Sequence, residues 1–231
     1  MSTLHAPFRY DYVGSFLRPE KLKKARAEFD KGTITGEELT NVEDECIREL
    51  VAKQKKAGYH VITDGEFRRA TWHLDFMWGF EGVAHEKDGG GVQFNGEMAD
   101  LEATYLVGKV KAKAHPFVEY FKFLKQFEDE QTVAKYTIPA PAQMYQQMIV
   151  PQNIEQTRKF YATDEELIED IAKAYVSAVG RGKRKLPPSK DAFSGIVSHK
   201  IVSVNSKIIH LMRRLWHGKR LSLIHISEPT R

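Results

Sequence analysis

The stretch Tyr59-His-Val-Ile-Thr-Asp-Gly-Glu66 decides the fold, because it places a β-rich segment directly after a long helical pattern. In that pattern, the apolar residues among 46–51 recur at helical spacing on one face, and Gly58 is a natural end. Residues 10–16 form an earlier β-rich segment. Strand, helix, strand is the unit of a parallel sheet, whose ligands gather past the carboxyl ends of the strands.

The remaining chain continues this alternation. Residues 20–30 and 116–128 are helix-like, and the capping-box patterns Thr40-Asn-Val-Glu43 and Thr163-Asp-Glu-Glu166 predict the starts of two more helices. Strands are predicted at residues 59–63, as above, and also at residues 103–113 and 132–138. We therefore expect an α/β fold: the N-terminal half of a TIM-type (β/α)8 barrel, with a glycine-rich, hairpin-like excursion over residues 82–100.

Composition excludes several protein classes. The chain has 231 residues, 42% of them hydrophobic and 29% charged, as in ordinary globular proteins. Its apolar runs are far shorter than the roughly 20 residues needed to cross a bilayer, and the N-terminus lacks a signal-peptide pattern. Cys46 is the single cysteine, which excludes an internal disulfide and fits a reducing compartment. We therefore expect a cytoplasmic protein without a membrane partner.

Charge divides the chain near residue 180. Residues 1–180 carry 23 Lys and Arg against 29 Asp and Glu, a net charge of −6, whereas residues 181–231 carry 12 against 2, a net charge of +10. Such asymmetry indicates a separate origin or a basic tail. We divide the chain into a barrel-like part at 1–180, a basic segment of doubtful reading frame at 181–220, and a tail at 221–231.

The tail has an unusual interpretation. Leu221-Ser-Leu-Ile-His-Ile-Ser-Glu-Pro-Thr-Arg231 back-translates to a sequence resembling the adapter used in transposase-based library preparation. We therefore predict that these residues derive from sequence handling, and exclude them from reasoning about the fold. Residues 181–231 are predicted to pack poorly, because they lack acidic partners and apolar periodicity.

Polar residues suited to substrate binding follow two of the predicted strands. Gly14 and Ser15 lie in the motif Val13-Gly-Ser-Phe-Leu-Arg-Pro19, and Asp64 and Glu66 lie in Val61-Ile-Thr-Asp-Gly-Glu-Phe-Arg-Arg69. A serine hydroxyl and nearby N–H groups can hold a carboxylate, while an ionised glutamate complements a cation. The alternatives are a self-bonded turn serine and a solvated loop carboxylate.

These paired motifs, with Trp72 and Asp75-Phe76 after them, resemble the barrel domain of cobalamin-independent methionine synthase, especially its short single-barrel relatives. The resemblance extends over residues 7–178. It implies methyl transfer from a methylated folate, methyltetrahydrofolate, to homocysteine. It also implies that Gly14 and Ser15 lie beside the amino-acid end of homocysteine and that Glu66 binds its ammonium group, with Asp64 and Arg68 as neighbours.

The resemblance further implies zinc, which holds the substrate sulfur as a thiolate. The family ligands are one histidine, two cysteines and a glutamate from later strands, but no cysteine follows Cys46 here. We therefore assign no metal ligand and no catalytic residue, and expect this chain to be inactive by itself.

Two alternatives stay open. A related barrel enzyme could act on another thiol or decarboxylate a porphyrin, and the fold alone does not choose among these reactions. The basic segment with Arg213-Arg214-Leu-Trp216 could instead bind nucleic acid through phosphate contacts and stacking. We expect small-molecule partners rather than nucleic acid, because a run of charge is most often a solvated face.

Overall fold

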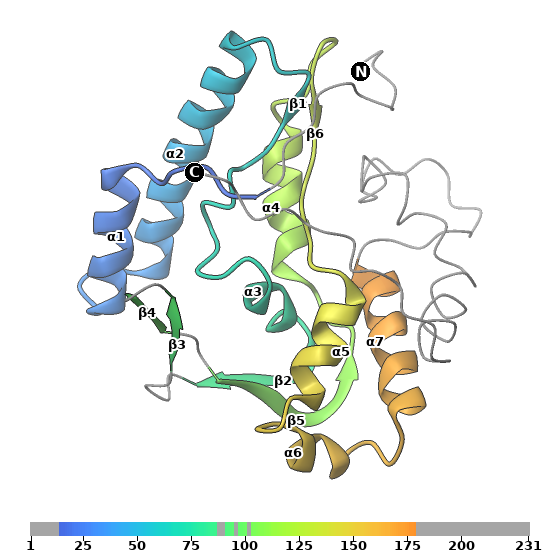
Figure 1. The fold of residues 1–231 in the computed structure, drawn as a ribbon. Coiled ribbons are helices and arrows are strands. Elements are labelled where there is room, and N and C mark those ends of the chain that lie inside the picture. The colour runs from blue at the N-terminus through green and yellow to red at the C-terminus, as the bar shows by residue number, and fades with distance from the viewer. Residues whose placement is uncertain (1–13, 87–90, 95–96, 101–102, 179–231) are drawn as a thin grey trace.

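The computed structural model describes residues 14–86, 91–94, 97–100 and 103–178 (Figure 1). Its helices are α1 (Glu20–Asp30), α2 (Gly36–Lys56), α3 (Leu74–Met77), α4 (Pro116–Lys125), α5 (Pro141–Ile149), α6 (Ile154–Arg158) and α7 (Asp164–Ala178). Its strands are β1 (Val61–Ile62), β2 (Glu81–Glu86), β3 (Gly91–Phe94), β4 (Glu97–Asp100), β5 (Ala103–Lys111) and β6 (Val133–Ala134).

The parallel pair β1 and β6 matches the expected barrel unit. Val61 pairs with Val133 and Ile62 with Ala134, so the two strands end at the same edge. Helix α2 precedes β1 and helix α4 precedes β6, which gives the alternation of a (β/α) barrel. The fold is thus mixed α/β and consistent with part of a barrel. Strands β1 and β6 are each shorter than the strands predicted at 59–63 and 132–138.

Helix α2 begins earlier than predicted. The capping box is formed by Thr35 and Glu38, whose reciprocal bonds measure 3.2 Å from Glu38 N to Thr35 Oγ1 and 2.7 Å from Thr35 N to Glu38 Oε2. The predicted start at Thr40 is therefore wrong: its hydroxyl donates to Gly36 O within the helix at 2.8 Å. Glu43, assigned to that box, is buried against two arginines instead.

Other predictions for the helices are confirmed. Cys46, Ile47, Leu50 and Val51 form the buried face of α2, and Gly58 follows its end with a φ of 82°. In α7 the buried residues include Leu167, Ile171, Ala172 and Tyr175, and Thr163 Oγ1 accepts a hydrogen bond from Glu166 N. Helices α3, α5 and α6 were not predicted.

The excursion after α3 is antiparallel, as expected. Strand β2 pairs with β5, and β3 and β4, which lie between them in sequence, pair with each other. The segment predicted as a strand at 103–113 thus belongs to the excursion and not, as expected, to the parallel sheet of the barrel. A register shift lies between Glu81 and Val83, where Gly82 has a φ of 87°. A Cβ atom at Gly82 would lie 2.4 Å from Lys109 O, so this bulge requires glycine.

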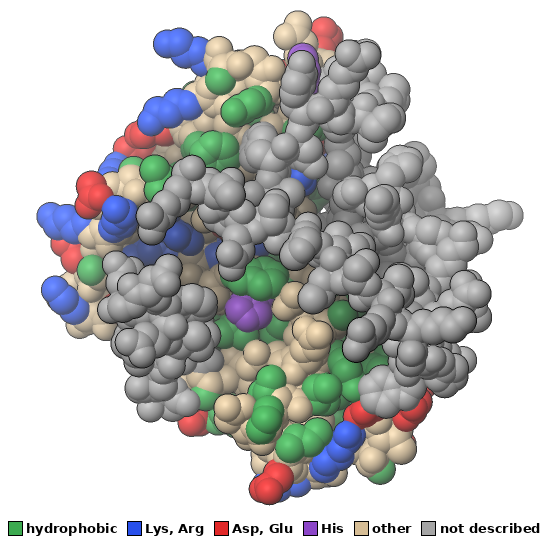
Figure 2. Space-filling model, viewed as in Figure 1, with side chains coloured by type: hydrophobic (Ala, Val, Ile, Leu, Met, Phe, Trp, Pro, Cys, Tyr) green, Lys and Arg blue, Asp and Glu red, His purple; other side chains and the backbone are tan. Residues whose placement is uncertain are grey.

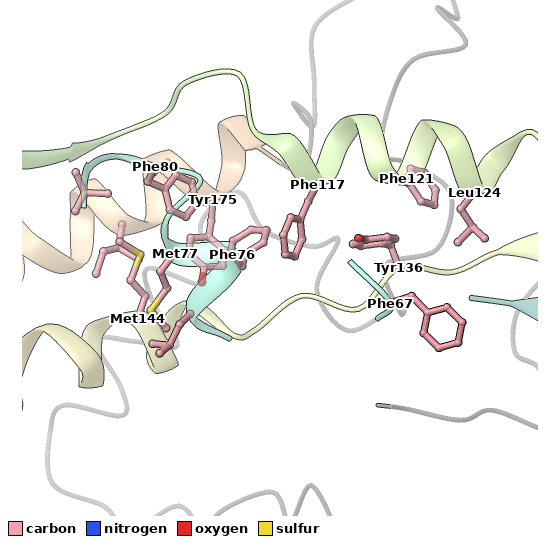
Figure 3. Packing of buried hydrophobic residues seen from close by; sticks show 14 of the residues in the cluster. Phe67, Phe76, Met77, Phe80, Phe117, Phe121, Leu124, Tyr136, Met144 and Tyr175 are labelled. Atoms are coloured by element: carbon pink, nitrogen blue, oxygen red, sulfur yellow. The ribbon is translucent and has the colours of Figure 1, made fainter. Parts of the chain in front are cut away.

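One apolar core joins the helices to two of the three described sheets, β1–β6 and β2–β5. Figure 3 shows its aromatic centre, in which Phe76, Phe117 and Tyr175 come from α3, α4 and α7. The ring centroid of Phe76 lies 5.2 Å from that of Phe117 and 5.1 Å from that of Tyr175. Tyr136, just after β6, continues the cluster toward Phe121. This packing fixes α4 against the β1 and β6 edge on which the polar loops lie.

Some predictions fall partly or wholly outside the described residues. Residues 10–13 of the first predicted strand and all of 181–231 lie there, so the division at 180 stays a prediction. Within residues 14–19 no strand is formed, and Gly14 lies in a bend with a φ of 99°. In the described part of the chain, no helix is both long and apolar enough to cross a membrane.

Candidate functional site

The loop that follows β1 is fixed to helix α2 by a buried glutamine. Gln54 Nε2 donates to Thr63 O at 2.8 Å, and Thr63 N donates to Gln54 Oε1 at 2.9 Å. The amide side chain of Gln54 thus makes the two hydrogen bonds with the backbone of Thr63 that a neighbouring strand would otherwise make. Because Gln54 is buried and these two bonds hold Thr63, they set the direction in which the chain leaves β1.

Two successive residues of this loop adopt the left-handed backbone conformation. Gly65 has a φ of 65° and Glu66 a φ of 58°, and Glu66 is the one non-glycine residue with a positive φ among those described. Such a conformation costs a non-glycine residue roughly 1–2 kcal/mol. It is stabilised by Asp64, whose Oδ1 accepts a hydrogen bond from Glu66 N at 3.0 Å. Backbone strain of this kind clusters at functional sites.

The carboxylate of Glu66 lies where β1 and β6 end. Its residue is only 6% exposed, and its Oε1 accepts hydrogen bonds from Thr137 Oγ1 at 2.8 Å and from Arg69 Nη1 at 3.3 Å. Thr137 follows β6, so the bond joins the carboxyl ends of the two parallel strands. This is the edge at which barrel enzymes bind their substrates.

Asp64 is buried beside Tyr136. Burial first, and the nearby Asp64 carboxylate second, raise the pKa of Tyr136 well above its usual value, so its hydroxyl stays protonated. Asp64 is 3% exposed, and its Oδ1 is engaged by the loop backbone. Its observed contacts therefore shape the loop that presents Glu66.

The first motif lies beside this loop. Phe16 N donates to Gly65 O at 3.1 Å, and Arg18 Nη2 donates to Arg69 O at 2.8 Å and to Glu66 O at 3.3 Å. Ser15 is exposed and is the neighbour of Phe16 in sequence. The structure therefore brings the segment of Gly14 and Ser15 together with the loop of Asp64 and Glu66.

Arg68, expected as a neighbour of the substrate site, points elsewhere. Its guanidinium forms ion pairs with Glu43, at 3.2 Å, and with Asp44, both on α2. It also lies 5.0 Å from the ring centroid of Tyr120. Arg26 of α1 donates to Glu43 and to the carbonyl oxygen of Phe67. Arg68 thus ties the outer side of the loop to the helices.

A cavity of about 400 Å³ opens on this outer side. Arg68, Asp75, Trp78, Lys113 and Tyr120 are among its lining residues, whereas Glu66 and Asp64 are not. Figure 2 shows one face of the molecule, on which charged side chains of both signs gather over α1 and α2. Because its lining includes neither Glu66 nor Asp64, the cavity is separate from the carboxylate at the end of β1. The two sequence motifs lie at that carboxylate and favour it as the candidate site.

Comparison with known proteins agrees with the position of these motifs. Residues 10–161 match the family described as cobalamin-independent synthase, catalytic domain. This region contains both motifs and the Glu66–Thr137 contact. The chain belongs to this family.

Two relatives of this cobalamin-independent synthase chain come from Bacillus subtilis (strain 168). Uncharacterized protein YxjG is 36% identical over 199 residues, covering 84% of this chain and 51% of YxjG. Uncharacterized protein YxjH is 36% identical over 174 residues, covering 75% of this chain and 44% of YxjH. The chain thus spans about half the length of the curated relatives it matches.

A solved structure of a family relative has the same fold. It is described as a putative vitamin-B12 independent methionine synthase from Listeria monocytogenes and is 34% identical to this chain. The match has a TM-score of 0.59 and covers 77% of this chain and 48% of that protein. The fold of this cobalamin-independent synthase chain is thus similar to about half of a larger structure.

The zinc that the family resemblance implies does not fit the described residues. No three His, Cys, Asp or Glu side chains lie together there in an arrangement that could hold a metal ion. Cys46 is 2% exposed on the core face of α2, and burial raises the pKa of its thiol. A metal-binding thiolate needs the opposite shift. We therefore derive no step through zinc for this chain.

Sequence reasoning proposed Glu66 and Asp64 as site residues but did not predict the residues that hold them. Arg69 and Thr137 contact the Glu66 carboxylate, and Gln54 fixes the start of the loop. One signal was available: Thr137 lies near the end of a predicted strand, at the edge where polar residues are expected to meet. Pairing between residues 71 positions apart nevertheless depends on packing that periodicity does not encode.

Proposed function

We propose that this chain carries the amino-acid-binding part of an enzyme that moves a methyl group from methyltetrahydrofolate to homocysteine. The observation that carries the proposal is the buried Glu66 carboxylate, held by Thr137 where β1 and β6 end. At family level, the comparisons support an enzyme of the methyltransferase type. The particular substrates are part of the proposal.

The proposed roles follow from the chemistry of the two loops. Glu66 binds the substrate ammonium, because a fixed carboxylate and a cation form a strong charge-assisted hydrogen bond. The Ser15 hydroxyl and nearby backbone N–H groups of the first motif bind the substrate carboxylate. Asp64 holds the loop in shape through its bond to Glu66 N. Together these contacts orient an α-amino acid so that its side chain leads away from the loops.

In this proposal, the chain itself does not supply the metal site that activates the substrate thiol. A metal site with two cysteines cannot be built from a chain whose one cysteine is Cys46. We therefore expect the purified 231-residue chain to bind the amino acid without transferring a methyl group. Elemental analysis for zinc and an assay with methyltetrahydrofolate check this, and stoichiometric zinc with turnover would contradict it.

Binding of methionine, the expected product, tests the role of Glu66. We expect Glu66→Gln to weaken the affinity at least tenfold, because the variant loses a charge-assisted bond to the ammonium. Glu119→Gln, which removes an exposed carboxylate on α4, is the matched control and should leave the affinity unchanged. NMR titration can measure dissociation constants in the millimolar range. Equal affinities of Glu66→Gln and the wild type would exclude the proposal.

A further inference from the structure

Arg69 is the most deeply buried charged side chain near the proposed site. The residue is 1% exposed, and its guanidinium bonds to Glu66 Oε1, Trp72 O and Thr137 O. The guanidinium carbon lies 4.8 Å from the ring centroid of Phe117 and 5.0 Å from that of Tyr136. Both aromatic rings and three acceptors thus fix one planar group, a geometry that lysine cannot reproduce.

Arg69 links three segments that are far apart in sequence. Its side chain joins the loop after β1 to Thr137 after β6, and its carbonyl oxygen accepts a hydrogen bond from Arg18 of the first motif. Its backbone N–H donates to Glu66 O at 3.1 Å, which closes the turn between the two residues. Arg69 therefore contacts the loop of Glu66, the segment that follows β6 and Arg18 of the first motif.

The bonds to Glu66 have a directional consequence. Arg69 Nη1 and Thr137 Oγ1 both donate to Oε1, and neither of these bonds uses Oε2. A carboxylate held through one oxygen presents the other in a fixed direction. We propose that Arg69 is a positioning residue that fixes Glu66 Oε1, so that Oε2 meets the ammonium of the amino-acid substrate. This inference rests on the proposed function.

Arg68 provides a matched comparison in the same loop. Its side chain is also buried, at 4% exposure, and also pairs with carboxylates and lies over an aromatic ring. Its partners, however, are Glu43 and Asp44 on α2 rather than Glu66. Loss of Arg68 should therefore lower stability without acting selectively on the ammonium contact.

The experiment compares two ligands that differ only at the ammonium position. Methionine and its 2-hydroxy analogue are titrated by NMR into the wild type and into the variants Arg69→Lys, Arg69→Met, Arg68→Lys and Glu66→Gln. We expect Arg69→Met to weaken methionine binding about tenfold and Arg69→Lys about threefold, while the affinity for the analogue changes less than twofold. Arg68→Lys should leave the ratio of the two affinities as in the wild type.

A second comparison separates positioning from folding. Glu66→Gln combined with Arg69→Lys should lose no more methionine affinity than Glu66→Gln alone, because residues that act through one contact are not additive. Arg69→Lys retains the charge, so it decides the question if Arg69→Met does not fold.

Each other outcome overturns a particular claim. Suppose that Glu66→Gln selectively loses affinity for methionine. If Arg69→Lys then loses affinity equally for both ligands, or for neither, Arg69 is merely structural and this inference alone is overturned. If Glu66→Gln keeps the wild-type affinity, or the wild type binds neither ligand, the proposed function fails and this inference fails with it.

Discussion

At the scale of single residues, Gly65 controls the position of Glu66. It combines a left-handed φ of 65° with a close approach, because an added Cβ would lie 2.5 Å from Leu50 Cδ2. Leu50 belongs to the buried face of α2, so any shift there disturbs the core. The glycine therefore lets the loop turn sharply while it stays packed on the helix.

Gly65→Ala tests this close approach. We expect a loss of about 2–3 kcal/mol in the free energy of unfolding, because the cost of the left-handed conformation and that of displacing Leu50 add. Gly32→Ala is the control: Gly32 has a φ of 72°, but an added Cβ meets no atom within 4 Å, so it should lose only about 1 kcal/mol. Urea unfolding measures both variants, and equal losses would refute the role of the Leu50 contact.

His115 illustrates a buried histidine that serves the fold. It is 4% exposed, its Nδ1 accepts from Phe117 N at 3.3 Å, and its Nε2 donates to Phe76 O at 2.9 Å. Burial lowers the pKa of His115 to about 4. The hydrogen bond to Phe76 O acts in the opposite direction and raises the pKa, whereas the positive charge of Lys113 adds a smaller lowering. The neutral ring therefore caps α4 and joins it to α3.

The pH dependence of stability follows from that pKa. The unfolded chain binds a proton at His115 more readily than the folded chain, so stability is lost as the pH falls from about 6.5 to about 4. The loss is on the order of 3 kcal/mol, because each pKa unit corresponds to about 1.36 kcal/mol. His115→Gln should lower stability at pH 7.5 but flatten this dependence relative to the wild type. Urea unfolding at several pH values measures both, and parallel curves for His115→Gln and the wild type would disprove the assignment.

At the scale of elements, the sequence around α2 contains the pattern Thr-x-x-Glu twice, and the observed start of the helix shows which of the two caps it. Thr35 and Thr40 are each followed three residues later by glutamate, but only Thr35 forms the capping box. Thr35→Ala should lower the free energy of unfolding by about 1 kcal/mol. Thr40→Ala should change it by less than about 0.5 kcal/mol, because alanine favours a helix interior. Thermal or urea unfolding of the two variants checks this, and a larger loss in Thr40→Ala would contradict the observed helix start.

Helical periodicity predicted the elements that depend on their own sequence. The buried face of α2 and its end at Gly58 follow from spacing and local charge alone. The extents of β1 and β6 did not, because a ladder exists only where the partner strand lies in register. Helix α5 was not predicted, although Pro141 is at its first turn, a position that proline favours.

At the scale of the whole molecule, the two motifs predicted which loops come together but not the contacts that hold them. Glu66 and Asp64 were assigned to the candidate site because polar residues follow a strand, and the family resemblance supplied the expected ligand. The contact with Thr137 and the aromatic environment of Arg69 arise only when α4 and β6 pack against β1. Long-range packing of this kind leaves no periodic signal in a single sequence.

The central claim is that Glu66 binds the ammonium of an amino-acid substrate, and a crystal structure of the 231-residue chain with methionine tests it most directly. We predict that the ammonium lies about 2.7–3.2 Å from Glu66 Oε2, with the methionine carboxylate at Ser15 and the thioether directed away from both loops. Methionine bound in another place, or with its ammonium turned away from Glu66, would contradict the account.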